Sequence, residues 1–223
     1  MPDQVTGSGS EPADGPIADE YAPIEPVEVE RVFTGRVWNL RRDTVEYGDG
    51  RIVREYVDHT GAVAVLALDD DDRAFLIQQY RHPVRTRDWE IPAGLLDIDG
   101  EPPLEAAQRE LAEEADLEAD DWSVLTEFYN SPGGSDEALR IYLARGLRPT
   151  AEPFPREAEE ADMQTRWVPL DELVEAVLAR RVQNAALVIA ALAASASRAA
   201  GWATLAPADA PWPAHPKLGR RTE

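Results

Sequence analysis

Three glutamates near the middle of the chain, Glu110, Glu113 and Glu114, have the types and the spacing to bind a divalent cation. In a helix, positions i, i+3 and i+4 place their side chains on one face. Like charges at this spacing repel by roughly 0.2–0.5 kcal/mol per pair, and a cation among them would relieve that repulsion. Ligands that are all oxygen suit Mg²⁺ or Mn²⁺. The alternative interpretation is an ordinary solvated acidic helix.

The neighbouring residues favour the helix that this site needs. Pro102 and Pro103 suit its entry, because the N–H that proline lacks would be unpaired there. Arg109 precedes Glu113 by four positions and can hold one carboxylate in place. Apolar residues recur at helical spacing and would face a core: Leu104, Ala107 and Leu111.

The order Gly94, Glu101 and then Arg109-Glu-Leu-Ala-Glu-Glu114 resembles the Nudix box, Gly-x5-Glu-x7-Arg-Glu-U-x-Glu-Glu-x-Gly-U, in which U is aliphatic. Two positions depart from it. Six residues separate Gly94 from Glu101, which implies a loop that is one residue longer. Asp116 stands in place of the closing glycine, at a helix end where the left-handed conformation is usual and aspartate is tolerated. Every carboxylate of the box is kept.

Three further stretches resemble the ADP-ribose pyrophosphatase branch of the Nudix hydrolases, and the resemblance runs from about Arg31 to Ala200. They are His59-Thr-Gly-Ala-Val-Ala-Val65 with Gln79-Tyr-Arg-His-Pro83, Trp89-Glu-Ile-Pro-Ala-Gly-Leu-Leu96, and Ser131-Pro-Gly133. Pro132 lies fifteen residues after Leu117, where that branch has a proline.

The chemistry of a diphosphate linkage can be argued independently of the resemblance. Water attacks phosphorus, and the protein positions the reactants and stabilises charge on oxygen. Divalent ions bridging the phosphates would serve both tasks and lower the pKa of a bound water. We expect Glu110 and Glu114 to be the first ligands, assisted by Glu113, while Glu101 supports Arg109.

The resemblance implies the remaining site residues. It adds the main-chain carbonyl of Ala93 to the metal ligands and takes the general base from an acidic loop before Met163, with Glu159 first and Glu160 as runner-up. Arg81 would hold a phosphate or the terminal ribose, and Arg54 would lie beside the adenine, often from the partner subunit. Either arginine could instead be a surface ion pair. Ser131, Pro132 and Gly133 would shape the terminal ribose site.

Composition narrows the class of protein. The chain has 223 residues with 43% apolar content, enough for one domain with a sizeable core. There is no cysteine, which excludes disulfides and thiolate chemistry. The net charge of −21 disfavours nucleic acid and anionic membranes as partners. The sequence has neither an apolar run long enough to span a membrane nor a secretory signal, so a cytoplasmic location is the default.

The chain divides into four parts. Residues 1–28 read as a disordered acidic leader, 29–58 as an N-terminal β unit with two strands and a turn at 47–50, 59–200 as the Nudix domain, and 201–223 as a Pro-rich tail. A two-stranded unit is marginal alone, and must pack on the next sheet or on a second subunit. A homodimer that exchanges these strands is the expectation.

Within the domain we expect strands at 62–68 and 74–80 joined by a hairpin turn at 69–72, which lacks the glycine and glutamate of a calcium loop. Further strands are expected at 122–129, 138–144 and 163–168, with a long loop over 145–162. Asp171 is expected to cap one helix, and a second should run from Asn184 to about Ala200.

These elements predict an α/β protein, a Nudix-type α/β/α sandwich with a mixed sheet and an added N-terminal antiparallel β unit. The resemblance implies a Mg²⁺-dependent enzyme that cleaves ADP-ribose to AMP and ribose 5-phosphate. The alternatives are another nucleoside diphosphate derivative as substrate, such as an ADP-sugar, NADH or a dinucleoside polyphosphate, and a Nudix-like module that senses ADP-ribose without cleaving it.

Overall fold

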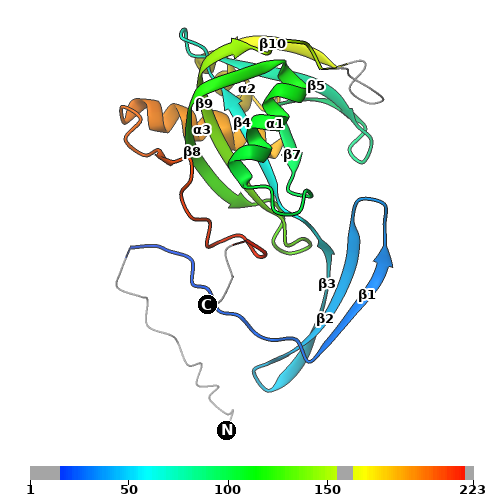
Figure 1. Cartoon of the computed structure of the whole chain (residues 1–223). Helices are drawn as coiled ribbons and strands as arrows, with labels where there is room; N and C mark the ends of the chain where they lie inside the picture. Colours follow the sequence, from blue (N-terminus) through cyan, green and yellow to red (C-terminus); the bar gives the residue numbers. More distant parts are fainter. Residues whose placement is uncertain (1–15, 155–162, 219–223) are drawn as a thin grey trace.

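The computed structural model of the chain describes residues 16–154 and 163–218 (Figure 1). In this part of the chain the strands form three sheets, with the orders β1-β2-β3, β10-β5-β6 and β11-β8-β9-β4-β7. The five-stranded sheet is mixed, because β4 pairs in parallel with β9 and antiparallel with β7. The α/β sandwich with an added N-terminal antiparallel unit is therefore confirmed.

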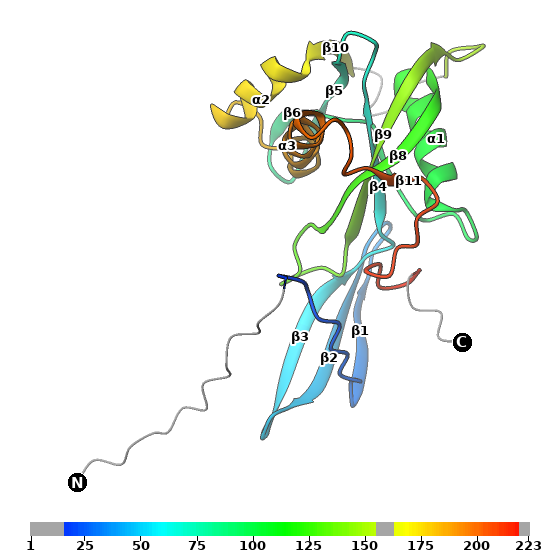
Figure 2. The same cartoon turned by 90° about the vertical axis from the view of Figure 1, so that its left-hand side faces the viewer.

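The N-terminal sheet extends away from the rest of the molecule (Figure 2). It consists of β1 (Glu28–Thr34), β2 (Asn39–Tyr47) and β3 (Gly50–Asp58). The prediction of two strands was wrong, because the chain reverses at Gly35, whose N–H donates to the carbonyl of Trp38 at 2.9 Å. A Cβ at Gly35 would lie 2.2 Å from that carbonyl oxygen, so only glycine fits the turn.

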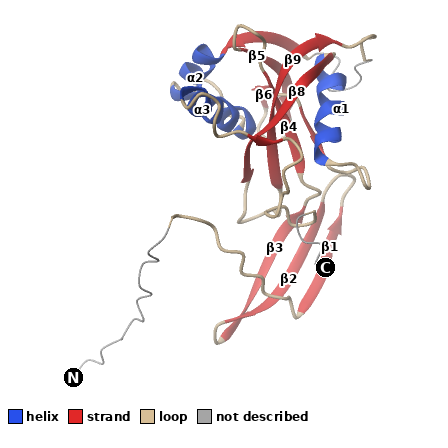
Figure 3. Ribbon diagram, turned by 60° about the vertical axis from the view of Figure 1, so that its left-hand side comes forward, coloured by secondary structure: helices blue, strands red, loops and turns tan. Residues whose placement is uncertain are grey.

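The core is built around β4 (Ala62–Ala67), which is buried at every position. Its neighbours are β9 (Ala138–Pro149), β7 (Ala93–Leu95), β8 (Leu117–Tyr129) and the two-residue β11 (Ala206–Pro207). Helix α1 (Pro103–Ala115) lies on one side of this sheet, while α2 (Leu170–Leu178) and α3 (Ala185–Ala199) lie on the other (Figure 3). One apolar cluster fills each side.

The remaining sheet contains β5 (Arg73–Arg81), β6 (Thr86–Glu90) and β10 (Gln164–Pro169). The expected turn between β4 and β5 is present, with the N–H of Asp72 donating to the carbonyl of Asp69 at 3.0 Å. The expected hairpin is wrong, because the two strands separate into different sheets after a single bridge between Leu68 and Ala74. Strand β5 is therefore the central strand of a second sheet, between β10 and β6.

Two helix boundaries show what the local sequence can and cannot define. The second helix lies where it was expected, as α3, and Asn184 is its N-cap, with a side chain that accepts from the N–H of Leu187 at 3.1 Å. Asp171 does not cap α2, because the helix already begins at Leu170 after Pro169 and makes no side-chain cap bond. The expected loop over 145–162 was also wrong at its start, since β9 continues to Pro149.

No helix in the described ranges is both long enough and apolar enough to cross a membrane.

Candidate active site

Helix α1 presents its glutamates toward β7 because its opposite face is apolar. Ala106, Ala107 and Leu111 are fully buried against the sheet. The predicted proline entry is confirmed, with Pro102 at the N-cap and proline in the first turn. Asp116 ends the helix in the left-handed conformation, with φ of 53°.

Glu114 is the most buried of the three glutamates, with 8% of its surface exposed. Its Oε2 accepts a hydrogen bond from the main-chain N–H of Ala93 at 2.9 Å. This bond joins the helix to β7, so the carboxylate of Glu114 and the backbone of Ala93 lie side by side. Glu114 was expected as a metal ligand from its spacing, and the main-chain carbonyl of Ala93 only from the resemblance.

Glu110 packs directly over Gly94. A Cβ at Gly94 would lie 1.9 Å from Oε1 of Glu110, so the absence of a side chain at position 94 makes room for this carboxylate. Burial raises the pKa of Glu110, and the charges of Glu113 and Asp97 raise it further, while Arg109 opposes the shift. A buried carboxylate among other carboxylates is the environment in which a cation is most stabilising.

Arg109 binds three of the box carboxylates. Its Nε and Nη2 donate to the two oxygens of Glu101 at 2.9 and 3.0 Å. The expectation that Glu101 supports Arg109 is therefore confirmed. Its Nη1 donates to Glu110 at 2.6 Å and to Glu113 at 3.2 Å. The hydrogen bonds from Arg109 lower the pKa of Glu101, and those to Glu101 raise the pKa of Arg109. The guanidinium thus neutralises part of the acidic face.

Within the described residues, no three acidic or histidine side chains converge closely enough to ligate one ion. The reason is visible in the contacts, since Arg109 holds Glu110 and Glu113 while Glu114 turns to the N–H of Ala93. The donor set nevertheless fits a hard divalent cation, because it is all oxygen and partly buried. The cradle that Gly94 leaves for Glu110 supports the same conclusion.

A pocket of about 720 Å³ is lined in part by Ala93 and Gly94, the residues that lie against Glu114 and Glu110. Aromatic and charged side chains also line it, among them Trp38, His59, Arg81 and Glu137. The volume and the mixed lining suit a nucleotide-sized ligand. The same two residues therefore adjoin both the pocket and the carboxylates of α1.

Arg81 lines this pocket, with its guanidinium anchored on a buried carboxylate. Its Nε and Nη2 donate to the two oxygens of Glu90 at 2.8 and 2.6 Å. Glu90 is 3% exposed and also lies 3.5 Å from the amide nitrogen of Gln79. A bidentate pair fixes the planar fork, so the ion pair and the substrate role are compatible in one arginine.

His59 forms a second polar group in the pocket. Its ring stacks on Trp38, with centroids 4.2 Å apart. Its Nδ1 accepts from the N–H of Gly61 at 3.0 Å, which leaves Nε2 to carry the proton toward Glu137, 3.5 Å away. Burial lowers the pKa of His59, although Glu137 and Asp136 oppose that shift. A neutral, oriented imidazole can therefore donate or stack at the pocket wall.

The other predicted substrate residues lie farther from the pocket. Arg54 is exposed on β3, and its Nη1 donates to the carbonyl of Val53 at 2.9 Å. Ser131, Pro132 and Gly133 form the exposed tip of the turn between β8 and β9, and the pocket is lined by Asn130 and Ser135 on either side of them. The base candidates Glu159 and Glu160 lie outside the described residues.

The sequence did not predict that His59 and Glu137 face each other in the pocket. His59 entered only through the family resemblance, and Glu137 was not predicted as a site residue. The available signal was weak, because the two residues are far apart in sequence and meet through the bridge between Val57 and Ser135. An isolated histidine at the end of a predicted strand is more often structural than functional.

Comparison with known proteins defines the class. The chain matches the NUDIX domain family over residues 58–192, which include β4 and most of the helical elements. It therefore belongs to the Nudix family and is a Nudix hydrolase. It is 43% identical over 190 residues to an ADP-ribose pyrophosphatase of Mycobacterium tuberculosis, covering 85% of this chain and 91% of that protein.

A second relative, the methanol dehydrogenase activator of Bacillus methanolicus, is 36% identical over 165 residues, covering 74% of this chain and 88% of that protein. Among solved structures, one described as the crystal structure of an ADP compounds hydrolase superposes with a TM-score of 0.67. The match covers 82% of this chain and 99% of the chain in that structure, and the two sequences are 24% identical. At this identity the likeness supports the fold alone.

Proposed function

We propose that the protein hydrolyses the diphosphate bond of ADP-ribose, giving AMP and ribose 5-phosphate. The observation that carries the proposal is that Ala93 and Gly94 line a nucleotide-sized pocket and also lie against the carboxylates of Glu114 and Glu110. A diphosphate bound in the pocket would thus lie beside the acidic face. The relative at 43% identity supports ADP-ribose as the substrate.

Glu110, Glu113 and Glu114, with the carbonyl of Ala93, would hold Mg²⁺, for which Mn²⁺ can substitute. Bound there, the ion would offset charge on the diphosphate and make a coordinated water more acidic. The residues of the chain supply the rest. Arg109 orients two of these carboxylates, and the N–H of Ala93 fixes the third.

In the reaction, water forms a bond to one phosphorus while the bond from that phosphorus to the bridging oxygen breaks. The proton of the water passes to a carboxylate, for which Glu159 is our first candidate and Glu160 the second. Arg81 would bind phosphate or the terminal ribose, and the turn at Ser131, Pro132 and Gly133 would close the ribose end. Arg54 would contact the adenine from a partner subunit.

The direct test is hydrolysis of ADP-ribose with and without Mg²⁺, measured as AMP by chromatography. A panel containing an ADP-sugar, NADH and a dinucleoside polyphosphate identifies the preferred substrate. Efficient cleavage of one of these and not of ADP-ribose would replace the substrate proposal. Tight binding of ADP-ribose without cleavage would instead favour the alternative in which the protein senses ADP-ribose and does not hydrolyse it.

Glu159→Gln is expected to lower kcat by about 10²–10⁴-fold, because acid–base assistance contributes that much. Glu160→Gln is the matched control and should stay within about threefold of the native rate. Metal affinity, measured by calorimetry, should be unchanged in both. The reverse ranking would assign the base to Glu160, and full activity of both variants would remove this loop from the role.

A further inference from the structure

The segment formed by residues 206–218, termed here the C-terminal strap, lies beyond the stretch that matches the NUDIX family. It begins with β11, which pairs with β8 at Val124 and Ser123. From there it runs along the body of the molecule toward the base of the N-terminal sheet (Figures 1 and 2).

The middle of the strap is fastened by Arg140 of β9, which is 2% exposed. Its Nη1 donates to the carbonyl of Ala210 at 2.9 Å, and its Nη2 to that of Pro211 at 3.2 Å. The guanidinium also lies 4.7 Å from the centre of the buried Trp212 ring. A buried arginine with these partners gives the strap one fixed path.

His215 fixes the next turn of the strap. It is 1% exposed, and its Nδ1 accepts from the N–H groups of Lys217 and Leu218, both at 3.0 Å. Its ring packs on Gly61, where a Cβ would lie 2.1 Å from Nε2. Gly61 also has φ of +89°, which favours glycine. The strap is therefore in close contact with the start of β4.

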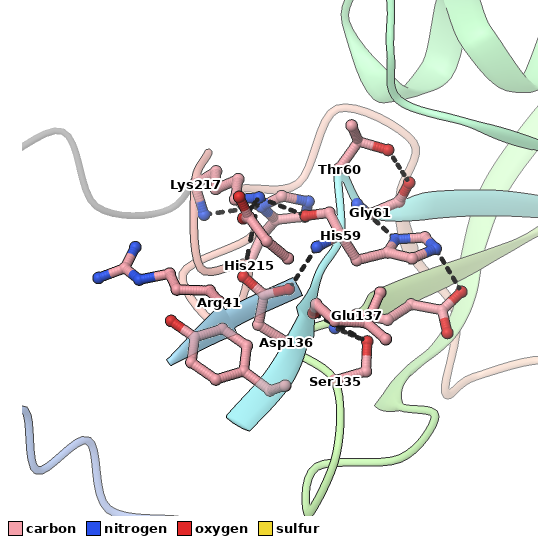
Figure 4. Close-up of polar contacts among 12 residues, drawn as sticks. Arg41, His59, Thr60, Gly61, Ser135, Asp136, Glu137, His215 and Lys217 are labelled. Atoms are coloured by element: carbon pink, nitrogen blue, oxygen red, sulfur yellow. Dashed lines mark hydrogen bonds and ion pairs between the residues drawn. The ribbon is translucent and has the colours of Figure 1, made fainter. Parts of the chain in front are cut away.

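Lys217 is the only lysine among the 22 basic residues of the chain. Its Nζ donates to Oδ1 of Asp58 at 2.6 Å and to the carbonyl of His59 at 2.5 Å, and lies 3.7 Å from Oδ2 of Asp136 (Figure 4). Three oxygens around one ammonium suit its tetrahedral donors better than a planar guanidinium.

The backbone that Lys217 holds is also a wall of the pocket. Oδ1 of Asp136 accepts from the N–H of His59 at 2.7 Å, while Val57 pairs with Gly134 and Asp136 through the main chain. Figure 4 shows the side chain of His59 leaving this junction toward Glu137. Lys217 therefore crosslinks the two segments whose side chains, His59 and Glu137, face the pocket.

We propose that Lys217 is a positioning residue for substrate binding: through Asp58, the carbonyl of His59 and Asp136, it sets the placement of His59 and Glu137 in the pocket wall. This inference rests on the proposed hydrolysis of ADP-ribose in that pocket. It assigns a binding role to a segment outside the matched domain. Lys217 contacts Asp58, His59 and Asp136 and not the carboxylates of α1, so the chemical step should be little affected by its loss.

The test compares native protein with Lys217→Met. The variant should raise the KM for ADP-ribose about tenfold, the factor that corresponds to one lost charge-assisted hydrogen bond. Its kcat should stay within about twofold, and its Tm within about 4 °C of the native value. Lys217→Arg keeps the charge and should restore KM to within about threefold. The control is Arg181→Met, which removes the same charge from an exposed position in the link between α2 and α3. Its KM and kcat should match those of native protein.

Chemical acetylation provides a second, independent arm. Because the chain has one lysine, an amine-directed acetylating reagent modifies only Nζ of Lys217 and the terminal amine. Acetylated native protein should show the raised KM, while Lys217→Arg treated in the same way should not change. Mass spectrometry verifies the modified positions.

A KM for Lys217→Met within about twofold of the native value would overturn the proposal. So would a variant whose kcat falls as much as its KM rises and whose Tm drops by much more than about 4 °C, because that pattern indicates a general loss of structure. If the protein does not hydrolyse ADP-ribose, the positioning role can still be tested, because amide hydrogen exchange does not depend on activity. In Lys217→Met the amides of His59 and Asp136 should exchange faster, with α1 unchanged. Unchanged exchange at both amides would also reject the positioning role.

Discussion

At the residue scale, the site depends on close approaches that only particular side chains permit. Gly94 leaves the space into which the Glu110 carboxylate fits, and Asp116 takes the left-handed conformation that glycine usually supplies. The aspartate adds what glycine lacks, since its Oδ1 accepts from the N–H of Phe154 at 2.7 Å. Both residues show that small backbone features hold the acidic face in place.

Gly94→Ala tests this account directly. The added Cβ would lie 1.9 Å from Oε1 of Glu110, so that carboxylate must move while the backbone can stay. We expect turnover to fall by about 10²-fold, as for a catalytic group displaced by about 1 Å. Gly50→Ala is the matched control, because a Cβ there meets open space. Near-native turnover of Gly94→Ala would show that Glu110 does not need its present position.

At the element scale, the C-terminal strap links three parts of the fold through buried polar contacts. Its His215 is packed between Trp212 and Gly61, where burial lowers the histidine pKa to about 4. The charges of Lys217 and Arg140 also lower this pKa, while Asp136 and a backbone contact oppose them. The histidine therefore stays neutral in the folded protein well below its ordinary value of 6.5.

This gives a pH dependence with a defined sign. Unfolded His215 binds a proton near pH 6.5 and folded His215 does not, so its contribution to stability is complete above pH 6.5 and is lost as the pH falls toward 4. The advantage of native protein over His215→Asn should shrink by about 2 kcal/mol between pH 7 and pH 5. Urea unfolding of both proteins at pH 7 and pH 5 measures this difference in unfolding free energy. Both pH values lie above the isoelectric point, which is near 4.4. A constant difference would contradict the buried neutral state.

Local sequence predicted those elements whose cause is local. The Arg109 and Glu101 pair, the start of α3 next to Asn184 and the fully buried β4 follow from spacing and periodicity. Contacts between distant segments could not be predicted, because nothing near Lys217 indicates an acceptor 158 positions earlier. The separation of β4 from β5 has the same origin, since a turn signal does not specify which sheet each strand joins.

At the scale of the whole molecule, the N-terminal sheet has apolar residues that the single chain does not cover. Val29, Phe33 and Val53 are each more than half exposed. Exposed apolar side chains on a separate sheet are typical of an interface. We propose a homodimer formed through this sheet, which would also bring Arg54 to the pocket of a partner.

Complementation tests the shared site. Arg54→Ala and Glu114→Gln should each be poorly active alone. A dimer with one of each has one site with both native residues if Arg54 acts across the interface. Coexpression at equal amounts should then recover about a quarter of native activity, since half of the dimers have one intact site. Activity equal to the mean of the two variants would place Arg54 in its own subunit, and a monomer in light scattering would reject the interface.

The three carboxylates held by Arg109 have a consequence for how the protein matures. Repulsion among the glutamates is partly balanced by a counterion that the chain itself provides, so folding need not wait for magnesium. The ion would then enter a finished scaffold by displacing the arginine contacts to Glu110 and Glu113. Chelation should accordingly leave an intact, refillable protein.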